Sequence, residues 1–254
     1  MILRQFLHFD PVGASYLLGC GGKASAAVID PIRPVEPYLE SAAATGMKIL
    51  YVIDTHIHAD HISSGRALAE ASGAKYTLFA GAKANFDFHR VDDGSVLELG
   101  NVLLTVMHTP GHTPACIAYV IGDAVFVGDT MFMPDYGTAR ADFPGGDARA
   151  LFRSLRRILE LPPQTRLFMC HDYLPASRSH YQWETTVAAE RRDNIHAHDG
   201  VSEDAFVAMR EARDRTLDVP RLILPSVQVN MRAGHLPPPE ENGVRYLKIP
   251  VNAI

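Results

Sequence analysis

The fold is decided by the run HIHADH, residues 56–61. Three imidazoles and one carboxylate stand within these six positions, at His56, His58, Asp60 and His61. Imidazole nitrogens and carboxylate oxygens are common ligands of transition metals. Burying such a group of side chains is costly without a metal or a charge partner. The run therefore predicts a metal site.

Other candidate ligands follow apolar segments that are typical of buried strands. Segments of this kind at residues 49–53, 102–107, 125–127 and 166–170 precede His56, His112, Asp129 and His171, in that order. Loops at the strand ends of a rigid scaffold commonly hold functional groups. We therefore expect these four side chains to converge at one edge of the fold.

The remaining sequence alternates short strand-like runs with stretches of helical character. We expect further strands at residues 16–18, 26–30 and 117–121, and helices at residues 35–44, 63–71, 148–161, 183–194 and 203–216. Residues 221–229 are expected to be extended and to lead into a tail that contains Pro and Gly. Because no segment marks a flexible linker, we expect one domain over residues 1–254, with a C-terminal extension from about residue 180.

The composition argues against several classes of protein. The net charge of −5 disfavours nucleic acid as the main partner, because phosphate binding needs a basic surface. No apolar run approaches the ~20 residues of a membrane span. The first residues lack the pattern of a signal peptide. Three scattered cysteines, Cys20, Cys116 and Cys170, do not form a disulfide framework. We therefore expect a cytoplasmic protein with no nucleic-acid partner and no membrane partner.

Together, the candidate ligands resemble the signature of the metallo-β-lactamase superfamily. The match consists of the pattern His-x-His-x-Asp-His at residues 56–61, followed in order by His112, Asp129 and His171, and it covers residues from about 14 to 172. The resemblance implies an α/β fold, the αββα sandwich, in which two mixed sheets pack face to face with helices outside. It also implies a metal site at one edge of the sandwich.

Two branches of the superfamily are similar to this chain, the type II glyoxalases and the persulfide dioxygenases. The segments that resemble the second branch are THIHADHISSG, RADF, HDY and VNMRAG, at residues 55–65, 140–143, 171–173 and 229–234. The ending, residues 234–250, resembles bacterial β-lactamase-like hydrolases linked to sulfide detoxification. Within the last of the four segments, we expect Asn230 and Arg232 to be structural braces.

The resemblance assigns roles to the candidate ligands. It implies that His56, His112 and Asp129 hold one Fe(II) ion per chain, because two imidazoles and one carboxylate leave open positions for O2. Asp60, His61 and His171 are then catalytic residues that, with His58, orient the ligands and hydrogen-bond water or substrate. In a hydrolase, the same four residues, His58, Asp60, His61 and His171, would bind a second metal, with two Zn or Mn ions per chain.

Two residues are assigned to the thiol carrier of the substrate, Arg140 and Tyr173. An arginine offers a two-pronged hydrogen-bond donor to a carboxylate. The alternatives are a surface salt bridge between Arg140 and Asp142, and a packed loop aromatic for Tyr173. Because His196 stands where relatives have an Arg that helps hold glutathione, the carrier stays open between glutathione, another low-molecular-weight thiol and a protein persulfide.

The resemblance implies an enzyme, a mononuclear Fe(II) persulfide dioxygenase in sulfide detoxification in the bacterial cytoplasm. It would oxidise a low-molecular-weight thiol persulfide, first of all glutathione persulfide, with O2 to sulfite and free thiol. The alternative is a dinuclear metal hydrolase of glutathione thioesters or lactones, since all the ligands for two metals are present. A third hypothesis is a metal-binding or redox-sensing accessory protein without turnover. Homodimers are the commonest soluble oligomers, so we expect a homodimer.

Overall fold

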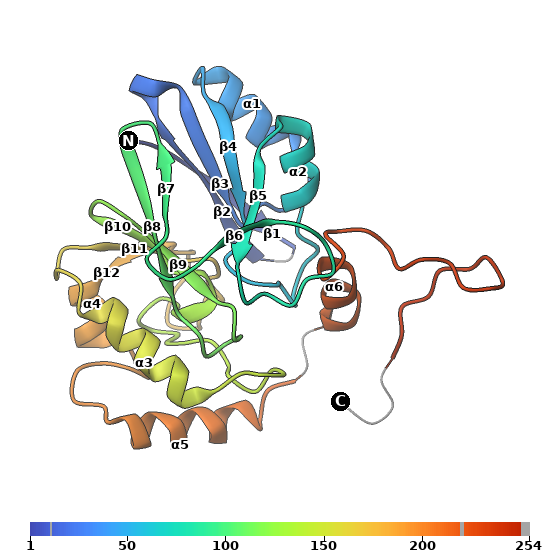
Figure 1. The fold of residues 1–254 in the computed structure, drawn as a ribbon. Helices are drawn as coiled ribbons and strands as arrows, with labels where there is room; N and C mark the ends of the chain where they lie inside the picture. Colours follow the sequence, from blue (N-terminus) through green and yellow to red (C-terminus); the bar gives the residue numbers. More distant parts are fainter. Residues whose placement is uncertain (11, 219–220, 250–254) are drawn as a thin grey trace.

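The fold is built on two six-stranded sheets that share a common core (Figure 1). The computed structural model describes residues 1–10, 12–218 and 221–249. In the first sheet, the strand order is β1-β2-β3-β4-β5-β6. These strands are β1 (Ile2–Phe9), β2 (Val12–Cys20), β3 (Ser25–Ile29), β4 (Lys48–Ile53), β5 (Lys75–Phe79) and β6 (His89–Val91).

The pairing within the first sheet positions the HIHADH run. β1, β2 and β3 pair antiparallel, whereas β3, β4, β5 and β6 pair in parallel. Parallel strands that are neighbours end at the same edge of a sheet. The loops that follow β3 and β4 therefore start side by side, and the second of them carries residues 56–61.

The second sheet supplies the other loops of the same edge. Its order is β12-β11-β10-β9-β8-β7. Its strands are β7 (Val96–Leu99), β8 (Val102–His108), β9 (Ile117–Ile121), β10 (Ala124–Phe126), β11 (Arg166–Phe168) and β12 (Glu184–Thr186). β10 and β11 are parallel, so the loops that carry Asp129 and His171 leave the sheet together. β8 ends at His108, shortly before His112.

Helices cover the outer side of each sheet (Figure 1). α1 (Glu36–Ala44) and α2 (Gly65–Ser72) pack on the first sheet. α3 (Ala148–Leu159), α4 (Val187–Asp193) and α5 (Glu203–Asp214) pack on the second. α6 (Ile223–Asn230) lies apart from both groups, and residues 231–249 after it project from the body as an arm. The predicted αββα sandwich is confirmed.

Side chains of one strand alternate between the central core and an outer core. On β2, Tyr16 and Leu18 join the cluster between the two sheets, where Tyr16 contacts Phe126 of β10 edge to face. Leu17, between them, joins Tyr38 of α1 in the cluster under the helices. Successive side chains of a strand point to opposite faces of the sheet. Because both faces are covered, residues 16–18 of this strand are apolar without alternation, as the sequence indicated.

The prediction that residues 221–229 are extended is wrong, because α6 begins at Ile223. Its proline, Pro225, stands in the first helical turn, where a missing N–H costs nothing. The β-branched side chains of this segment favoured a strand, but Val229 is buried in the helix and its packing overrides that preference.

The prediction of one helix over residues 183–194 is also wrong in its first part. Residues 184–186 form β12 at the edge of the second sheet, and α4 starts only at Val187. Thr186 makes the transition, since its hydroxyl accepts a hydrogen bond from the Ala189 N–H at 3.2 Å and caps the helix.

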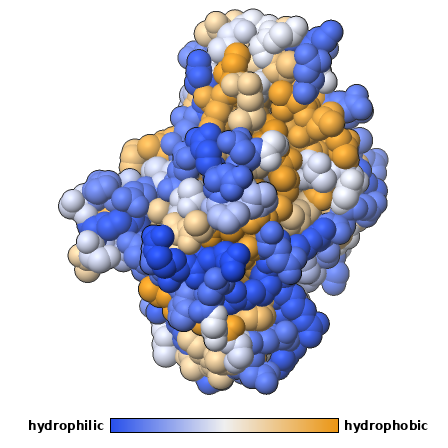
Figure 2. Space-filling view, turned by 90° about the vertical axis from the view of Figure 1, so that its left-hand side faces the viewer, coloured by the Kyte–Doolittle hydropathy of each residue, from blue (hydrophilic) through white to orange (hydrophobic). Residues whose placement is uncertain are grey.

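The surface combines hydrophobic and hydrophilic regions. Figure 2, which shows the side that lies at the left in Figure 1, has hydrophobic residues mainly in its upper half and a hydrophilic band across its middle. Among the residues that the structure describes, no helix has the length and apolar character needed to cross a bilayer.

Candidate metal centre

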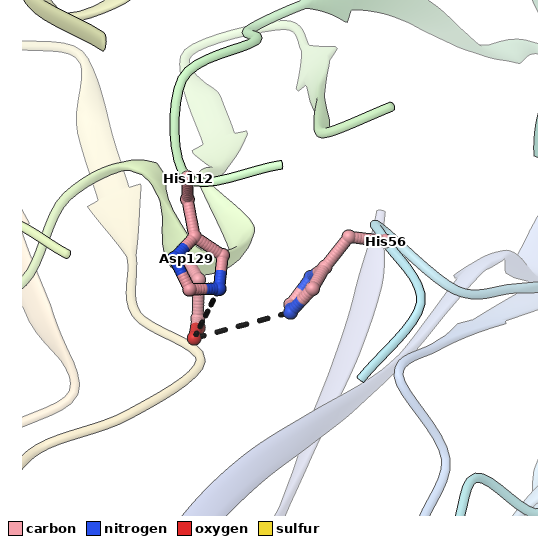
Figure 3. Close-up of side chains that lie close together, drawn as sticks. All are labelled: His56, His112 and Asp129. Carbon is pink, nitrogen blue, oxygen red and sulfur yellow. Dashed lines mark ion pairs between the residues drawn. The ribbon is translucent and has the colours of Figure 1, made fainter. Parts of the chain in front are cut away.

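Three of the predicted ligands face one another at the edge of the sandwich (Figure 3). The Nε2 atoms of His56 and His112 each lie 3.9 Å from Oδ2 of Asp129. His56 comes from the loop after β4, His112 from the loop after β8, and Asp129 from the turn after β10. The ligand atoms lie within 4.8 Å of one another, and all three residues are buried. This spacing suits one metal ion.

The other four predicted ligands lie beside these three. Asp60 pairs with two histidines, since its Oδ1 lies 3.1 Å from His61 Nδ1 and its Oδ2 lies 3.2 Å from His171 Nε2. His58 Nδ1 lies 4.0 Å from Asp60 Oδ1. His171 Nε2 also lies 3.5 Å from Asp129 Oδ1. The two carboxylates therefore join all seven side chains into one cluster.

Hydrogen bonds on the outer ring nitrogens orient the histidines. His112 Nδ1 donates to the carbonyl oxygen of Arg140 at 2.8 Å, and His171 Nδ1 donates to the carbonyl oxygen of Val12 at 2.7 Å. Each ring thereby leaves Nε2 to face the carboxylates. Metal-binding histidines almost always make such a second hydrogen bond, which fixes their tautomer and ring orientation.

Asp30 contacts the HIHADH loop and the residue before it, and the sequence analysis did not predict this role. Its two oxygens accept hydrogen bonds from the Thr55 N–H at 2.7 Å and the Thr55 hydroxyl at 2.9 Å. Oδ1 also lies 3.2 Å from His58 Nε2, and burial raises the pKa of this carboxyl to about 6. Asp30 directly follows β3, so the strand-end pattern that indicated the ligands contained the signal for it.

The donor set fits metal ions, as its unpaired atoms indicate. His58 Nδ1, His61 Nε2, His171 Nε2 and Asp129 Oδ1 are buried and make no hydrogen bond with the described residues, although the ion pairs given above involve all of them except His61 Nε2. Buried polar atoms without a partner are rare, because each costs about 1–3 kcal/mol. Four such atoms in one cluster of imidazoles and carboxylates are what a bound cation would satisfy.

The carboxylates also control protonation in this cluster. Burial lowers the pKa of His171, but Asp129 and Asp60 outweigh burial and raise this pKa to about 9. His58 shows the opposite balance, because burial and then the charge of His61 lower its pKa to about 3. A proton on His171 and a metal cation would thus stabilise the same two carboxylates.

Asn230 ties the HIHADH loop together from the end of α6. Its Nδ2 donates to the carbonyl oxygens of His58 and His61, both at 2.8 Å, and its Oδ1 accepts from the Ser63 N–H at 3.0 Å. All of these atoms belong to buried residues. Asn230 thus holds the backbone of a loop that lies about 170 residues earlier in the chain. The structure places it where the brace was expected.

Arg140 contributes its backbone to the cluster and its side chain to a salt bridge. Its carbonyl oxygen accepts from His112, as described above. Its guanidinium donates to both oxygens of Asp142, at 2.6 and 2.8 Å, and to the carbonyl oxygen of Asp218 at 2.8 Å. This is the alternative geometry that the sequence left open for Arg140.

Tyr173 lies at the mouth of the cluster, with 45% of its surface exposed. Its ring stacks on His171, with centroids 5.6 Å apart, and on Tyr136, with centroids 4.7 Å apart. Phe132 meets it edge to face at 5.3 Å. A partly exposed tyrosine, backed by Tyr136 and the buried Phe132, therefore lies directly beside a candidate ligand.

A buried ion pair on α5 fixes the segment that orients His112. Arg210 Nη2 lies 2.7 Å from Asp214 Oδ1, and Arg210 Nη1 donates to the Thr138 carbonyl oxygen at 3.1 Å. Asp214 Oδ2 accepts from the Ala141 N–H at 2.9 Å. The pair therefore hydrogen-bonds to the backbone on both sides of Arg140 in the sequence, at Thr138 and Ala141. Sequence reasoning missed it, because an Arg and an Asp four residues apart are typical of an exposed helix face.

Comparison with known proteins identifies the family. A family model of the metallo-beta-lactamase superfamily matches residues 10–86 and 76–171. The chain belongs to the metallo-β-lactamase superfamily. The resemblance in the sequence is thereby confirmed. Members of this superfamily are metal-dependent enzymes, which agrees with the donor set described above.

Relatives within the superfamily differ in name. A probable metallo-hydrolase of Burkholderia pseudomallei is 48% identical, over 97% of this chain and 98% of its own length. Glyoxylase B2 of Dictyostelium discoideum is 46% identical, over 80% of this chain and 76% of its own. The human mitochondrial persulfide dioxygenase ETHE1 is 32% identical, over 92% of this chain and 89% of its own.

A solved structure matches the fold closely. The crystal structure of ETHE1 from Myxococcus xanthus superposes with a TM-score of 0.84 at 33% identity. The match covers 92% of this chain and all of that chain. The chain is thus similar both to relatives named as hydrolases and to relatives named as persulfide dioxygenases.

Proposed function

We propose that this protein is a mononuclear Fe(II) persulfide dioxygenase that acts on glutathione persulfide or a similar low-molecular-weight thiol persulfide. The observation that carries the proposal is the group of His56, His112 and Asp129, two imidazoles and one carboxylate facing one space. This donor set is typical of iron enzymes that use O2. The match to the ETHE1 structure over nearly the whole chain supports the same reaction.

In the proposed reaction, RSSH, O2 and water give RSH, sulfite and two protons. Both atoms of O2 pass to the terminal sulfur, water supplies the third oxygen, and the bond between the two sulfurs breaks. Bound Fe(II) would supply the redox chemistry with O2, which Zn(II) does not offer. Among the residues of this chain, His56, His112 and Asp129 would hold the metal.

The remaining residues of the cluster would manage protons and substrate. Asp60, which pairs with His61 and His171, would accept a proton from the attacking water. The exposed ring of Tyr173 would pack against the thiol carrier. Arg140 would keep His112 oriented through its carbonyl oxygen.

Oxygen uptake tests the proposal directly. The protein is purified without O2, loaded with one equivalent of Fe(II) and given glutathione persulfide. We expect O2 consumption and an equal amount of sulfite. The Zn(II)-loaded protein and the His112→Ala variant serve as controls and should consume no O2. An iron-loaded protein that leaves both O2 and persulfide unchanged would contradict the proposal.

The second candidate function is a dinuclear hydrolase of glutathione thioesters. It is favoured by the Nε2 atoms of His61 and His171, which are buried and make no hydrogen bond with the described residues, and by the relatives named metallo-hydrolase and glyoxylase. Two tightly bound metals per chain, together with rapid hydrolysis of S-lactoylglutathione, would replace the first proposal with this one. We place either reaction in the bacterial cytoplasm, where Cys20, Cys116 and Cys170, all unpaired with one another, would stay reduced.

A further inference from the structure

A pocket borders the HIHADH loop on the side of α6. Its volume is about 550 Å³, within the usual range for sites that bind small organic molecules. It is lined by Arg33, Ile62, Val229, Gly234, His235, Leu236 and Arg245. These residues come from the loop after β3, from the HIHADH loop, from α6 and from the projecting arm (Figure 1). We call it the Arg33 pocket.

The lining of the Arg33 pocket is cationic. Arg33, His235 and Arg245 are its charged or ionisable side chains, and no Asp or Glu is among the lining residues. Arg33 and Arg245 are exposed, and the ion pairs within the described part of the chain include neither of them. Arg245 donates one hydrogen bond, to the Pro237 carbonyl oxygen at 2.7 Å. Two arginines that line one pocket without a carboxylate suit an anionic ligand.

The Arg33 pocket adjoins the metal cluster through the backbone. Ile62 directly follows His61, and Ile32, next to Arg33, forms a β-bridge with Ser63 of the same loop. Gly234 packs between these segments. A Cβ atom at Gly234 would lie 3.6 Å from the Ser63 carbonyl oxygen and 4.0 Å from Arg33 Nη2. Arg33 therefore directly follows a residue, Ile32, that pairs with the segment immediately after the HIHADH loop.

The cation that the sequence assigned to the thiol carrier is engaged elsewhere. The guanidinium of Arg140 donates three hydrogen bonds, to Asp142 and to the Asp218 carbonyl oxygen. A carrier with an anionic end would have to displace that salt bridge to use Arg140. In the Arg33 pocket, neither arginine makes an ion pair with another described residue, so an anion would displace no such pair there.

We propose that the Arg33 pocket binds the anionic end of the thiol carrier, while the sulfur end lies at the metal cluster. This inference rests on the proposed function in one respect, namely that the ligand of the pocket is the thiol carrier of the substrate. The chemistry recognised is an organic anion that also bears a thiol. Its negative groups are carboxylates in glutathione and phosphates in coenzyme A. Ile62, Val229 and Leu236 supply an apolar floor for the chain between the two ends.

Binding of the free thiol tests the pocket without any oxygen chemistry. The full-length, Zn(II)-loaded protein is titrated calorimetrically with reduced glutathione, with coenzyme A and with cysteamine, which has no anionic group. We compare the wild type with the double variant Arg33→Gln/Arg245→Gln. The matched control is Arg192→Gln, an exposed arginine on α4 that does not line the pocket.

We expect the double variant to weaken the binding of one anionic thiol about tenfold, as the loss of two exposed charge contacts implies. The double variant should bind cysteamine as the wild type does, and Arg192→Gln should bind all three thiols with wild-type affinity. When position 33 carries Lys instead of Gln in the double variant, part of the lost affinity should return. In turnover, KM for the persulfide of the same thiol should rise while kcat stays constant. The thiol whose affinity falls more in the double variant, glutathione or coenzyme A, is identified as the ligand.

Two outcomes overturn the proposal. One is that the double variant binds each of the two anionic thiols with the same affinity as the wild type. The other is a wild type that binds neither thiol. Failure of the dioxygenase itself has a different signature, because the charge-dependent binding would persist in a protein that consumes no O2.

Discussion

At the scale of single residues, Asn230 shows how a neutral side chain can shape a candidate metal site without being one of its ligands. It satisfies two carbonyl oxygens and one N–H of the HIHADH loop, all buried. Those carbonyls belong to His58 and His61, so the position of the amide sets the backbone from which the two rings project. Residues that orient metal ligands commonly matter for affinity about tenfold to a hundredfold.

Replacement of Asn230 by Ala should therefore weaken metal binding and stability together. We expect about tenfold lower affinity for Co(II) and a free energy of unfolding lower by about 2–4 kcal/mol, because buried carbonyl groups lose their donors. Asn230→Asp keeps the acceptor for Ser63 but loses the donors, and it should be no better. Asn242→Ala, in the exposed arm, is the matched control. Equal Co(II) affinity in all three variants would contradict the role of Asn230.

At the scale of elements, α4 carries a buried carboxyl that the metal does not explain. Glu190 is fully buried, and its Oε2 accepts a hydrogen bond from Asn194 Nδ2 at 2.6 Å. Burial is the main cause that raises the pKa of Glu190 to about 8, with Asp135 and Asp193 adding to it. The folded protein therefore keeps a proton that the unfolded chain releases at a lower pH.

This carboxyl should make the protein less stable as the pH rises. Between pH 4.5, its ordinary pKa, and pH 8, the folded state holds one more proton than the unfolded state. The free energy of unfolding should fall by about 1.4 kcal/mol per pH unit over that window and level off above it. Denaturant titrations from pH 5 to 9 check this. Asp30 and His171, whose pKa values are also raised, add to the fall, so Glu190→Gln should remove only the share of Glu190 and make the slope shallower by about 1.4 kcal/mol per pH unit below pH 8. The same slope in this variant and in the wild type would contradict the prediction.

The elements also show how far the sequence could predict the site. Each of the seven candidate ligands follows an apolar strand, so the order of strands and polar residues sufficed to predict that they lie together. Asp30 obeyed the same pattern but stood alone after its strand, without neighbouring ligand types. Asn230 and the pair of Arg210 and Asp214 act over long separations, and only the packing of α5 and α6 shows what they hold. The helix α6 itself was hidden by Pro225 and by β-branched residues that favour strands.

At the scale of the whole molecule, the metal centre joins the two halves of the sandwich. His56 and His58 leave the first sheet after β4, whereas His112 and Asp129 leave the second sheet after β8 and β10. A metal held by His56, His112 and Asp129 would therefore cross-link both sheets at one edge. The C-terminal elements add to this edge from outside, because α5 holds the segment around Arg140 and α6 holds the HIHADH loop. One domain with a C-terminal extension, and a homodimer, stay predictions.

A cross-link between the sheets should stabilise the whole fold rather than one loop. Metal at 100 times its Kd contributes about 2.7 kcal/mol. For a chain of 254 residues, this corresponds to a rise in Tm of roughly 5–10 °C. Calorimetry of the metal-free protein, titrated with Fe(II) under N2, checks this prediction, and His112→Ala should remove most of the shift. The number of Fe(II) equivalents bound at saturation, measured by isothermal titration of the same protein, decides more: one for a single iron held by His56, His112 and Asp129, and two for a dinuclear hydrolase. If chelation removed all metal and left Tm unchanged, the cluster would not act as a link between the sheets, and its unpaired atoms would need another explanation.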